Sequence, residues 1–181
     1  MKEENCTHIL AVTACGSLRE HIKPGHFIFP DQFIDRTTKR VSTFFDGKDV
    51  QHISMANPFS SILRSYLVKI CDQKGLKYHN DGTVVTIEGP RFSTKAESHM
   101  FRSWGCDIIN MSTVPEVVLA KEKEIEYQAI AMSTDFDCWR ESEDEVTMDM
   151  VYATMKKNVE KVKDLIKTTV AELNNDTGKN L

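Results

Sequence analysis

Short apolar runs of the kind that form buried strands alternate with segments of helical periodicity along most of this chain. Alternation of this kind is typical of an α/β fold, in which helices cover the faces of a largely parallel sheet. The strand-like runs lie at residues 8–14, 26–30, 83–88, 107–110 and 127–133, and the helical segments at 62–73, 96–104, 116–124 and from 147 onward. The sequence therefore predicts an α/β sandwich with a mixed, mainly parallel sheet flanked by helices.

Residues that favour helix ends stand beside the helical segments. Ser60 is placed to cap the helix over residues 62–73, and Gly75 is placed to end it. Pro115 suits the first turn of the next helix but one, where its missing N–H would have no partner anyway. Thr147 is placed to cap a long final helix, whose lysines form a solvated face. These signals predict where the helices begin and end.

Size and composition indicate one globular domain over residues 1–181. Hydrophobic residues make up 40% of the chain, charged residues 28%, and the net charge is -4, so we expect no basic face for nucleic acid. The five cysteines are scattered, which predicts reduced thiols and no metal site. No apolar run reaches the ~18 residues of a membrane span. We therefore expect a cytoplasmic protein that binds neither membranes nor nucleic acid.

Polar side chains follow several of the predicted strands. Thr13, Asn110 and Asp135 each come at or near the end of an apolar run, and ligands of open α/β sheets bind beyond the carboxyl ends of strands. Asn110 opens a turn that leads into a helix, where backbone N–H groups and the Ser112 hydroxyl can meet an anion. The sequence predicts a ligand site at this edge of the sheet.

Two carboxylates, Asp135 and Asp137, lie at the end of the last predicted strand. A pair of acids suits a ligand that offers ring nitrogens and an exocyclic amine. Asp135 can donate a proton or hydrogen bond only if its pKa is raised, by burial and by the charge of Asp137. Such a pair shares its protons, so the pKa values belong to the pair.

Five segments together resemble the family of purine nucleoside and methylthioadenosine phosphorylases, and the resemblance runs from about residue 2 to about residue 170. The segments are TACGSLR at 13–19, DQFIDRT at 31–37, EGPRFS at 88–93, NMSTVPE at 110–116 and STDFD at 133–137. The resemblance implies an enzyme, a pentosyltransferase of purine and methionine salvage. Inorganic phosphate would cleave S-methyl-5'-thioadenosine to adenine and 5-methylthioribose 1-phosphate, with no other cofactor. It also implies a homotrimer, and we expect a nuclear as well as a cytoplasmic location.

The resemblance also assigns roles to single residues. Asp135 would protonate or hydrogen-bond N7 of the leaving purine, and Asp137 would accept from its 6-amino group. Phosphate would meet Thr13, the backbone at Ala14, and Ser112. Phe92 would stack on the base, and His52 would lie at the 5' end of the sugar. An apolar wall for the methylthio group would come from Val146, Met148 and Val151. The other positions that would contact the nucleoside are Ser93, Asn110 and Met111.

Each of these residues also has a structural explanation when taken singly. Thr13 and Ser112 could merely finish strands by bonding nearby backbone, and the two acids could lie in a solvated turn. Phe92 and Met111 could be ordinary core residues, and a lone histidine such as His52 is usually solvated. That histidine lies in the polar stretch from 35 to 58, which we expect to act as a lid.

Two features of the family pattern are missing from this chain. The sequence contains neither a Gly-x-Gly run nor an Arg-His pair, which hold phosphate in the family. We therefore expect a domain incomplete at the N-terminus, matching the C-terminal two-thirds of a family member. Two alternatives stay open: a phosphorylase of 6-oxopurine nucleosides, and a truncated subunit without activity. Ser93 favours a 6-aminopurine over a 6-oxopurine, since the 6-oxopurine enzymes carry Glu there.

Overall fold

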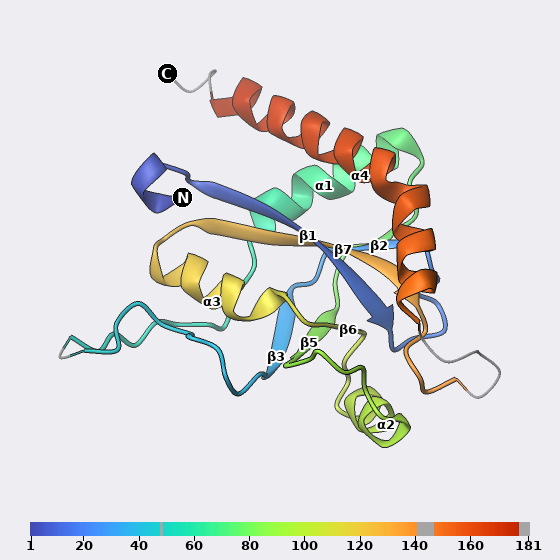
Figure 1. Cartoon of the computed structure of the whole chain (residues 1–181). Helices are drawn as coiled ribbons and strands as arrows, with labels where there is room; N and C mark the ends of the chain where they lie inside the picture. The colour runs from blue at the N-terminus through green and yellow to red at the C-terminus, as the bar shows by residue number, and fades with distance from the viewer. Residues whose placement is uncertain (48, 141–146, 178–181) are drawn as a thin grey trace.

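The computed structural model describes residues 1–47, 49–140 and 147–177, which form one mixed sheet with helices on both faces (Figure 1). The strand order is β3-β5-β6-β1-β7-β2-β4. Four of the strand pairings are parallel, and two, β1 with β6 and β2 with β7, are antiparallel. The elements are a short 3-10 helix Lys2–Glu4, β1 His8–Ser17, β2 Phe27–Ile28, β3 Gln32–Arg36, α1 Ser61–Lys74, β4 Tyr78–His79, β5 Thr83–Ile87, α2 Lys95–Ser103, β6 Ile108–Asn110, α3 Thr113–Glu122, β7 Glu126–Asp135 and α4 Met148–Thr177. The predicted fold class is confirmed.

Strand β7 lies between two hydrophobic cores because its side chains alternate between the faces of the sheet. Ala129 and Ala131 pack with α3 on one face. Ile130 and Met132 pack with α1 and α4 on the other. Figure 1 shows α3 on one side of β1 and β7 and the α1–α4 pair on the opposite side. This continuous burial is what the apolar run at 127–133 predicted.

The predicted helix ends are confirmed by their hydrogen bonds. The Ser60 hydroxyl accepts from the Leu63 amide at 3.2 Å, and Gly75 ends α1 with a left-handed φ of 64°. At the start of α4 the Thr147 hydroxyl accepts from the Met150 amide at 3.3 Å. Helix α2 carries a reciprocal capping box between Thr94 and Glu97. Pro115 lies in the first turn of α3, as predicted.

Two strands were not predicted from the sequence. β3 is an edge strand with only two partly buried apolar residues, and it is held by parallel pairing with β5. β4 has two residues and pairs with β2. Both owe their conformation to a partner strand far away in the sequence, and neither shows the alternation that marks a strand locally.

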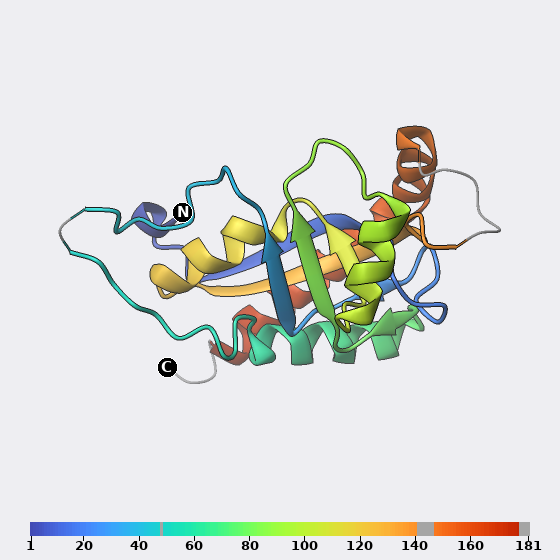
Figure 2. The ribbon, with the colours of Figure 1, turned by 90° about the horizontal axis from the view of Figure 1, so that it is seen from below.

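The long loop after β3 lies beside α3 (Figure 2). The Glu122 carboxylate at the end of α3 accepts from the Thr43 hydroxyl at 2.6 Å and from the Phe44 amide at 2.7 Å. Lys123 lies over the rings of Phe44 and Phe45. The part of the loop that α3 holds in this way therefore extends away from the carboxyl end of β7.

None of the helices in the described ranges is both long and apolar enough to cross a bilayer.

Candidate active site

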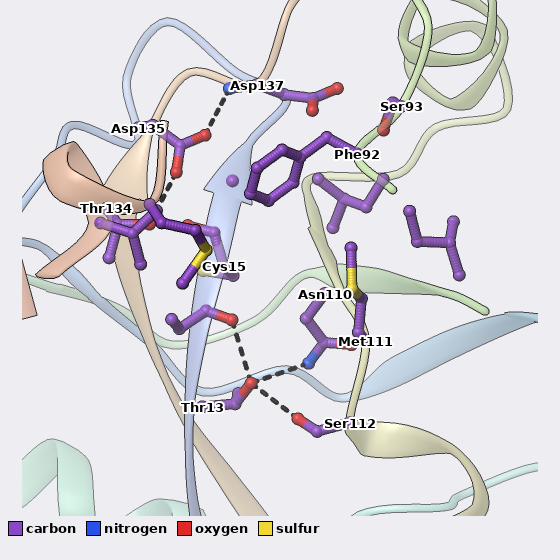
Figure 3. A pocket seen from close by; sticks show the side chains of 16 residues that line it. Thr13, Cys15, Phe92, Ser93, Asn110, Met111, Ser112, Thr134, Asp135 and Asp137 are labelled. Carbon is purple, nitrogen blue, oxygen red and sulfur yellow. Dashed lines mark hydrogen bonds between the residues drawn. The ribbon is translucent and has the colours of Figure 1, made fainter. Parts of the chain in front are cut away.

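A cavity of about 290 Å³ lies between the second half of β1 and the segments that follow β5, β6 and β7 (Figure 3). β6 pairs with β1 only at Gly16 and Ser17, and the two strands run in opposite directions. Beyond that pairing the chain turns from β6 into α3. The cavity lies between this turn and β1. Thr13 is therefore inside β1 rather than at its end as predicted, while Asn110 and Asp135 do end their strands.

The two acids lie at one end of this cavity and are buried, with 7% of Asp135 and 6% of Asp137 exposed. Asp135 accepts a hydrogen bond from the Thr134 hydroxyl at 2.6 Å and another from the Asp137 amide at 2.8 Å. Asp137 has a left-handed φ of 51°, which aspartate tolerates better than most residues. These acids are therefore fixed cavity walls, and the interpretation as a solvated turn is wrong.

Burial is the main cause that raises the pKa of both carboxyl groups. For Asp135 the hydrogen bonds from Thr134 and Asp137 act in the opposite direction, and the charge of Asp137 adds a smaller upward contribution. For Asp137 the hydroxyls of Ser98 and Ser93 favour the charged form, although neither completes a hydrogen bond of normal geometry with a described residue. The raised pKa that donation by Asp135 requires is therefore present in direction, with burial rather than its neighbour as the larger cause.

Phe92, Ser93 and Met111 form the wall that faces β1. Phe92 is 39% exposed and extends toward the cavity, so the interpretation of Phe92 as a core residue is wrong. The backbone turns at Gly89, which has a φ of 72°, and a Cβ there would come within 2.6 Å of the Met111 sulfur. A side chain at position 89 would therefore displace Met111 from the wall.

Hydroxyl and amide groups form the other end of the cavity. The Thr13 and Ser112 hydroxyls are 2.8 Å apart, and Thr13 also donates to the Ala14 carbonyl at 3.0 Å. The Asn110 amide donates to Thr113 at 2.7 Å and lies 3.3 Å from the Thr13 hydroxyl. Hydroxyl protons rotate freely, so the same pair can donate to an anion instead. The lining of the cavity, as far as the chain is described, contains no Lys, Arg or His.

The structure brings together most of the predicted site residues. Of these, Met148 and Val151 come from the first turn of α4. The predicted residues that line the cavity are Thr13, Ala14, Phe92, Ser93, Asn110, Met111, Ser112, Asp135, Asp137, Met148 and Val151. His52 is exposed in the long loop and does not line the cavity. Val146 lies outside the described residues.

Five lining residues were missed by sequence reasoning: Cys15, Gly16, Ile87, Ile109 and Thr134. Gly16 provides space, since a Cβ there would lie 3.0 Å from the Asp135 carboxylate and 3.1 Å from Ile109. Burial raises the pKa of the Cys15 thiol well above its ordinary value, and the charge of Asp135 adds to this effect. The only signal for these residues was their place beside predicted ones in the same segments. In the described part of the chain, no group of three or more His, Cys, Asp or Glu is placed to hold a metal ion.

The fold is that of a known class, and the chain belongs to the phosphorylase superfamily, whose sequence profile matches residues 1–171. The S-methyl-5'-thioadenosine phosphorylases of Danio rerio and Xenopus tropicalis are 56% and 54% identical to it over 178 residues, which are 96% of this chain. The aligned region is 64% and 63% of those relatives, so the chain spans slightly less than two thirds of their length.

Solved structures show the same likeness. Methylthioadenosine phosphorylase from Schistosoma mansoni in complex with adenine matches with a TM-score of 0.92 at 40% identity, over 96% of this chain and 68% of that one. A mutant of the adenosine/methylthioadenosine phosphorylase from the same organism, in complex with methylthioadenosine, matches with a TM-score of 0.90 at 39% identity, over 96% of this chain and 66% of that one. The family resemblance found in the sequence is confirmed.

Proposed function

We propose that this chain carries out the phosphorolysis of S-methyl-5'-thioadenosine to adenine and 5-methylthioribose 1-phosphate. The observation that carries the proposal is the cavity itself. Two buried acids with raised pKa values lie at one end, and a hydroxyl pair lies at the other. Relatives at 54–56% identity that are named for this substrate support the choice.

In the proposed reaction, the phosphate oxygen attacks the anomeric carbon while the bond from that carbon to the purine nitrogen breaks. The electron pair of that bond moves into the purine, and a proton or hydrogen bond from Asp135 to N7 stabilises the charge that develops there. Burial raises the pKa of Asp135, and this favours the protonated carboxyl that can donate. Thr13, the Ala14 backbone and Ser112 would hold the phosphate.

The preference for a 6-aminopurine rests on the acid end. Asp137 would accept from the exocyclic amine, and Phe92 would stack on the base. Position 93 carries a serine, so the carboxylate that could accept from N1–H of a 6-oxopurine is replaced by a hydroxyl. Met148 and Val151 give an apolar surface for a methylthio group. A 6-oxopurine phosphorylase remains the second candidate.

The proposal extends to the co-substrate, the assembly and the location of the protein. Inorganic phosphate is the co-substrate, and the displacement needs no other cofactor. We further propose that the protein assembles as a homotrimer in the cytoplasm and the nucleus, and that it binds neither nucleic acid nor membrane. A noncatalytic role, in which this chain modulates longer subunits, is the alternative from another class. It is favoured by the lack of cationic side chains in the described lining of the cavity.

The test is phosphate-dependent release of adenine from methylthioadenosine by the purified 181-residue chain, with inosine as the rival substrate. Asp135→Asn should lower the rate by about 10²–10⁴-fold, the usual contribution of a general acid. Asp46→Asn changes an exposed loop aspartate and should leave the rate unchanged. Faster cleavage of inosine would favour the second candidate. A folded chain that releases neither base would contradict the proposed activity and support the noncatalytic role.

A further inference from the structure

Arg40, which none of the preceding arguments uses, makes an unusual set of contacts. It follows β3 by four residues, and its side chain is 19% exposed. The guanidinium donates to four backbone carbonyls, from two separate segments of the chain. Nη1 donates to Met111 at 2.6 Å and to Val114 at 2.5 Å, and Nη2 donates to Ile87 at 3.3 Å and to Glu88 at 2.9 Å.

These two segments are the ones that extend β5 and β6 into the cavity wall. The sheet pairing between β5 and β6 ends at Thr86 with Asn110. Beyond it, one segment continues to Phe92 and the other to Ser112, and both of those residues line the cavity. Arg40 therefore connects the two segments at the point where the hydrogen-bond ladder of the sheet stops.

Arg40 is itself fixed by its surroundings. The Glu88 carboxylate lies 3.7 Å from its Nε and also accepts from the amides of Thr38 and Lys39, at 2.8 Å and 3.3 Å. The loop that carries Arg40 is thus tied to the same segment that the guanidinium contacts. The guanidinium is planar and rigid. Its donors therefore set the distance between the carbonyls as well as hydrogen-bonding each of them.

We propose that Arg40 is a positioning residue, which sets the distance between segments 87–93 and 110–115 and so holds Phe92 and Ser112 at a fixed separation. It does not line the cavity and would touch no reactant. The consequence for catalysis rests on the proposed function, whereas the structural part does not. The partly buried guanidinium directs its donors to four carbonyls, and the Glu88 carboxylate beside it also accepts from two amides.

Hydrogen exchange of the purified chain tests the structural part without any need for activity. In Arg40→Met, amide exchange in peptides covering 87–93 and 110–115 should rise about tenfold or more, because the ordering contacts are lost. Peptides from α1 and α4 should exchange as in the wild type. Arg64→Met is the matched control, since Arg64 is 23% exposed and pairs with Asp31 at 3.9 Å on another part of the molecule. Unchanged exchange in both segments would overturn the proposal.

Arg40→Lys separates the effect of charge from that of geometry, and it serves as the second variant if Arg40→Met does not fold. Lysine keeps the charge, but its single nitrogen has three donors and cannot reproduce the planar fork that reaches four carbonyls. It should therefore exchange as fast as the methionine variant. Wild-type exchange in Arg40→Lys would show that the charge alone suffices and would overturn the role of the planar group.

Turnover gives the second readout. If Phe92 and Ser112 are displaced, kcat/KM for methylthioadenosine should fall by about 10²-fold in folded Arg40→Met. Arg64→Met should keep the wild-type value. A purely structural role would reduce the amount of folded protein and leave kcat per folded molecule unchanged, which would contradict positioning. If the wild type itself has no turnover but the exchange difference appears, the proposed function fails and the positioning of the two segments stands.

Discussion

The two ends of the cavity are built on opposite physical strategies. At one end, Asp135 and Asp137 are buried carboxyl groups on a rigid strand end, and their chemistry comes from the loss of solvent. At the other end, Thr13 and Ser112 are neutral hydroxyls that bond to each other and can turn toward another partner. The comparison teaches that the acid end is preformed, whereas the hydroxyl end offers donors that can adapt to a partner.

The surroundings of the two ends differ in the same sense. Phe136 and Trp139 flank Asp137 in sequence and pack into a buried cluster with Leu18 and Phe101. Thr13 instead lies in the part of β1 that pairs with β7 on one edge and, among the described residues, with no strand on the other. The acid end therefore has a well-packed support, and the hydroxyl end lies at an open sheet edge.

Among the changes that test this contrast by ligand binding, the largest effect should come from filling the space at the acid end. Gly16→Ala would place a methyl group 3.0 Å from the Asp135 carboxylate and 3.3 Å from Cβ of Asp137, so both acids must move. Overpacking of this kind costs about 1–3 kcal/mol, and we expect adenine to bind about 10- to 100-fold more weakly. Calorimetric titration with adenine measures this.

Gly47→Ala is the control for that substitution, because a Cβ at Gly47 would meet no atom within 4 Å. It should bind adenine like the wild type. Normal adenine affinity in Gly16→Ala would show that the acids are not preformed for the base, and the contrast between the two ends would disappear.

A smaller effect is expected at the hydroxyl end. Thr13→Val keeps the shape of the side chain but removes the hydroxyl that contacts Ser112. Because the Ser112 hydroxyl and the backbone can still donate to the anion, we expect the net loss to be about 0.5–1.5 kcal/mol. The KM for phosphate should then rise about two- to tenfold while adenine affinity stays constant. Thr169→Val removes a buried hydroxyl of α4 that bonds Leu165, and it should change neither value. Equal weakening of adenine would mean that the two ends are not independent.

The smallest effect concerns stability and follows from the raised pKa of Asp135. Above the ordinary value of 3.8, the unfolded chain loses a proton that the folded chain retains, so the free energy of unfolding from this group falls as the pH rises through the window up to the raised pKa. Asn has no such proton. The Tm of Asp135→Asn relative to wild type should therefore increase from below pH 3.8 to neutral pH in thermal scans. Thr169→Val changes no titratable group, so its Tm difference from wild type should stay constant with pH. A constant difference for Asp135→Asn would refute the buried-acid interpretation.

Much of the fold was predictable because it depends on local signals. The long apolar run that became β7 and the caps at Ser60 and Thr147 act over a few residues, and each is found where the sequence placed it. β3 could not be found in this way, since its conformation comes from pairing with β5 some fifty residues later. The antiparallel run of β6 against β1 was equally hidden, and it moved Thr13 from a strand end to a strand interior.

The site was predicted through its motifs more than through its geometry. Asp135, Phe92 and Ser112 were named because they fall in family segments, and the structure places all three around one cavity. His52 was named in the same way, but its loop is held at the end of α3 by Glu122, and the cavity does not include it. Gly16 was missed because the sequence does not show how much room a residue has. Only the neighbouring side chains in the structure show why a glycine is needed there.

The double burial of β7 has a further consequence for Asp135. A slip of one residue would turn Ala129 and Ala131 toward α1 and α4, and would force Ile130 and Met132 against α3. Both interfaces reject that exchange, since each is sized for the side chains it now holds. Packing on both faces thereby fixes the register of β7. The fixed register in turn places the Asp135 carboxyl group beside Gly16 in every folded molecule.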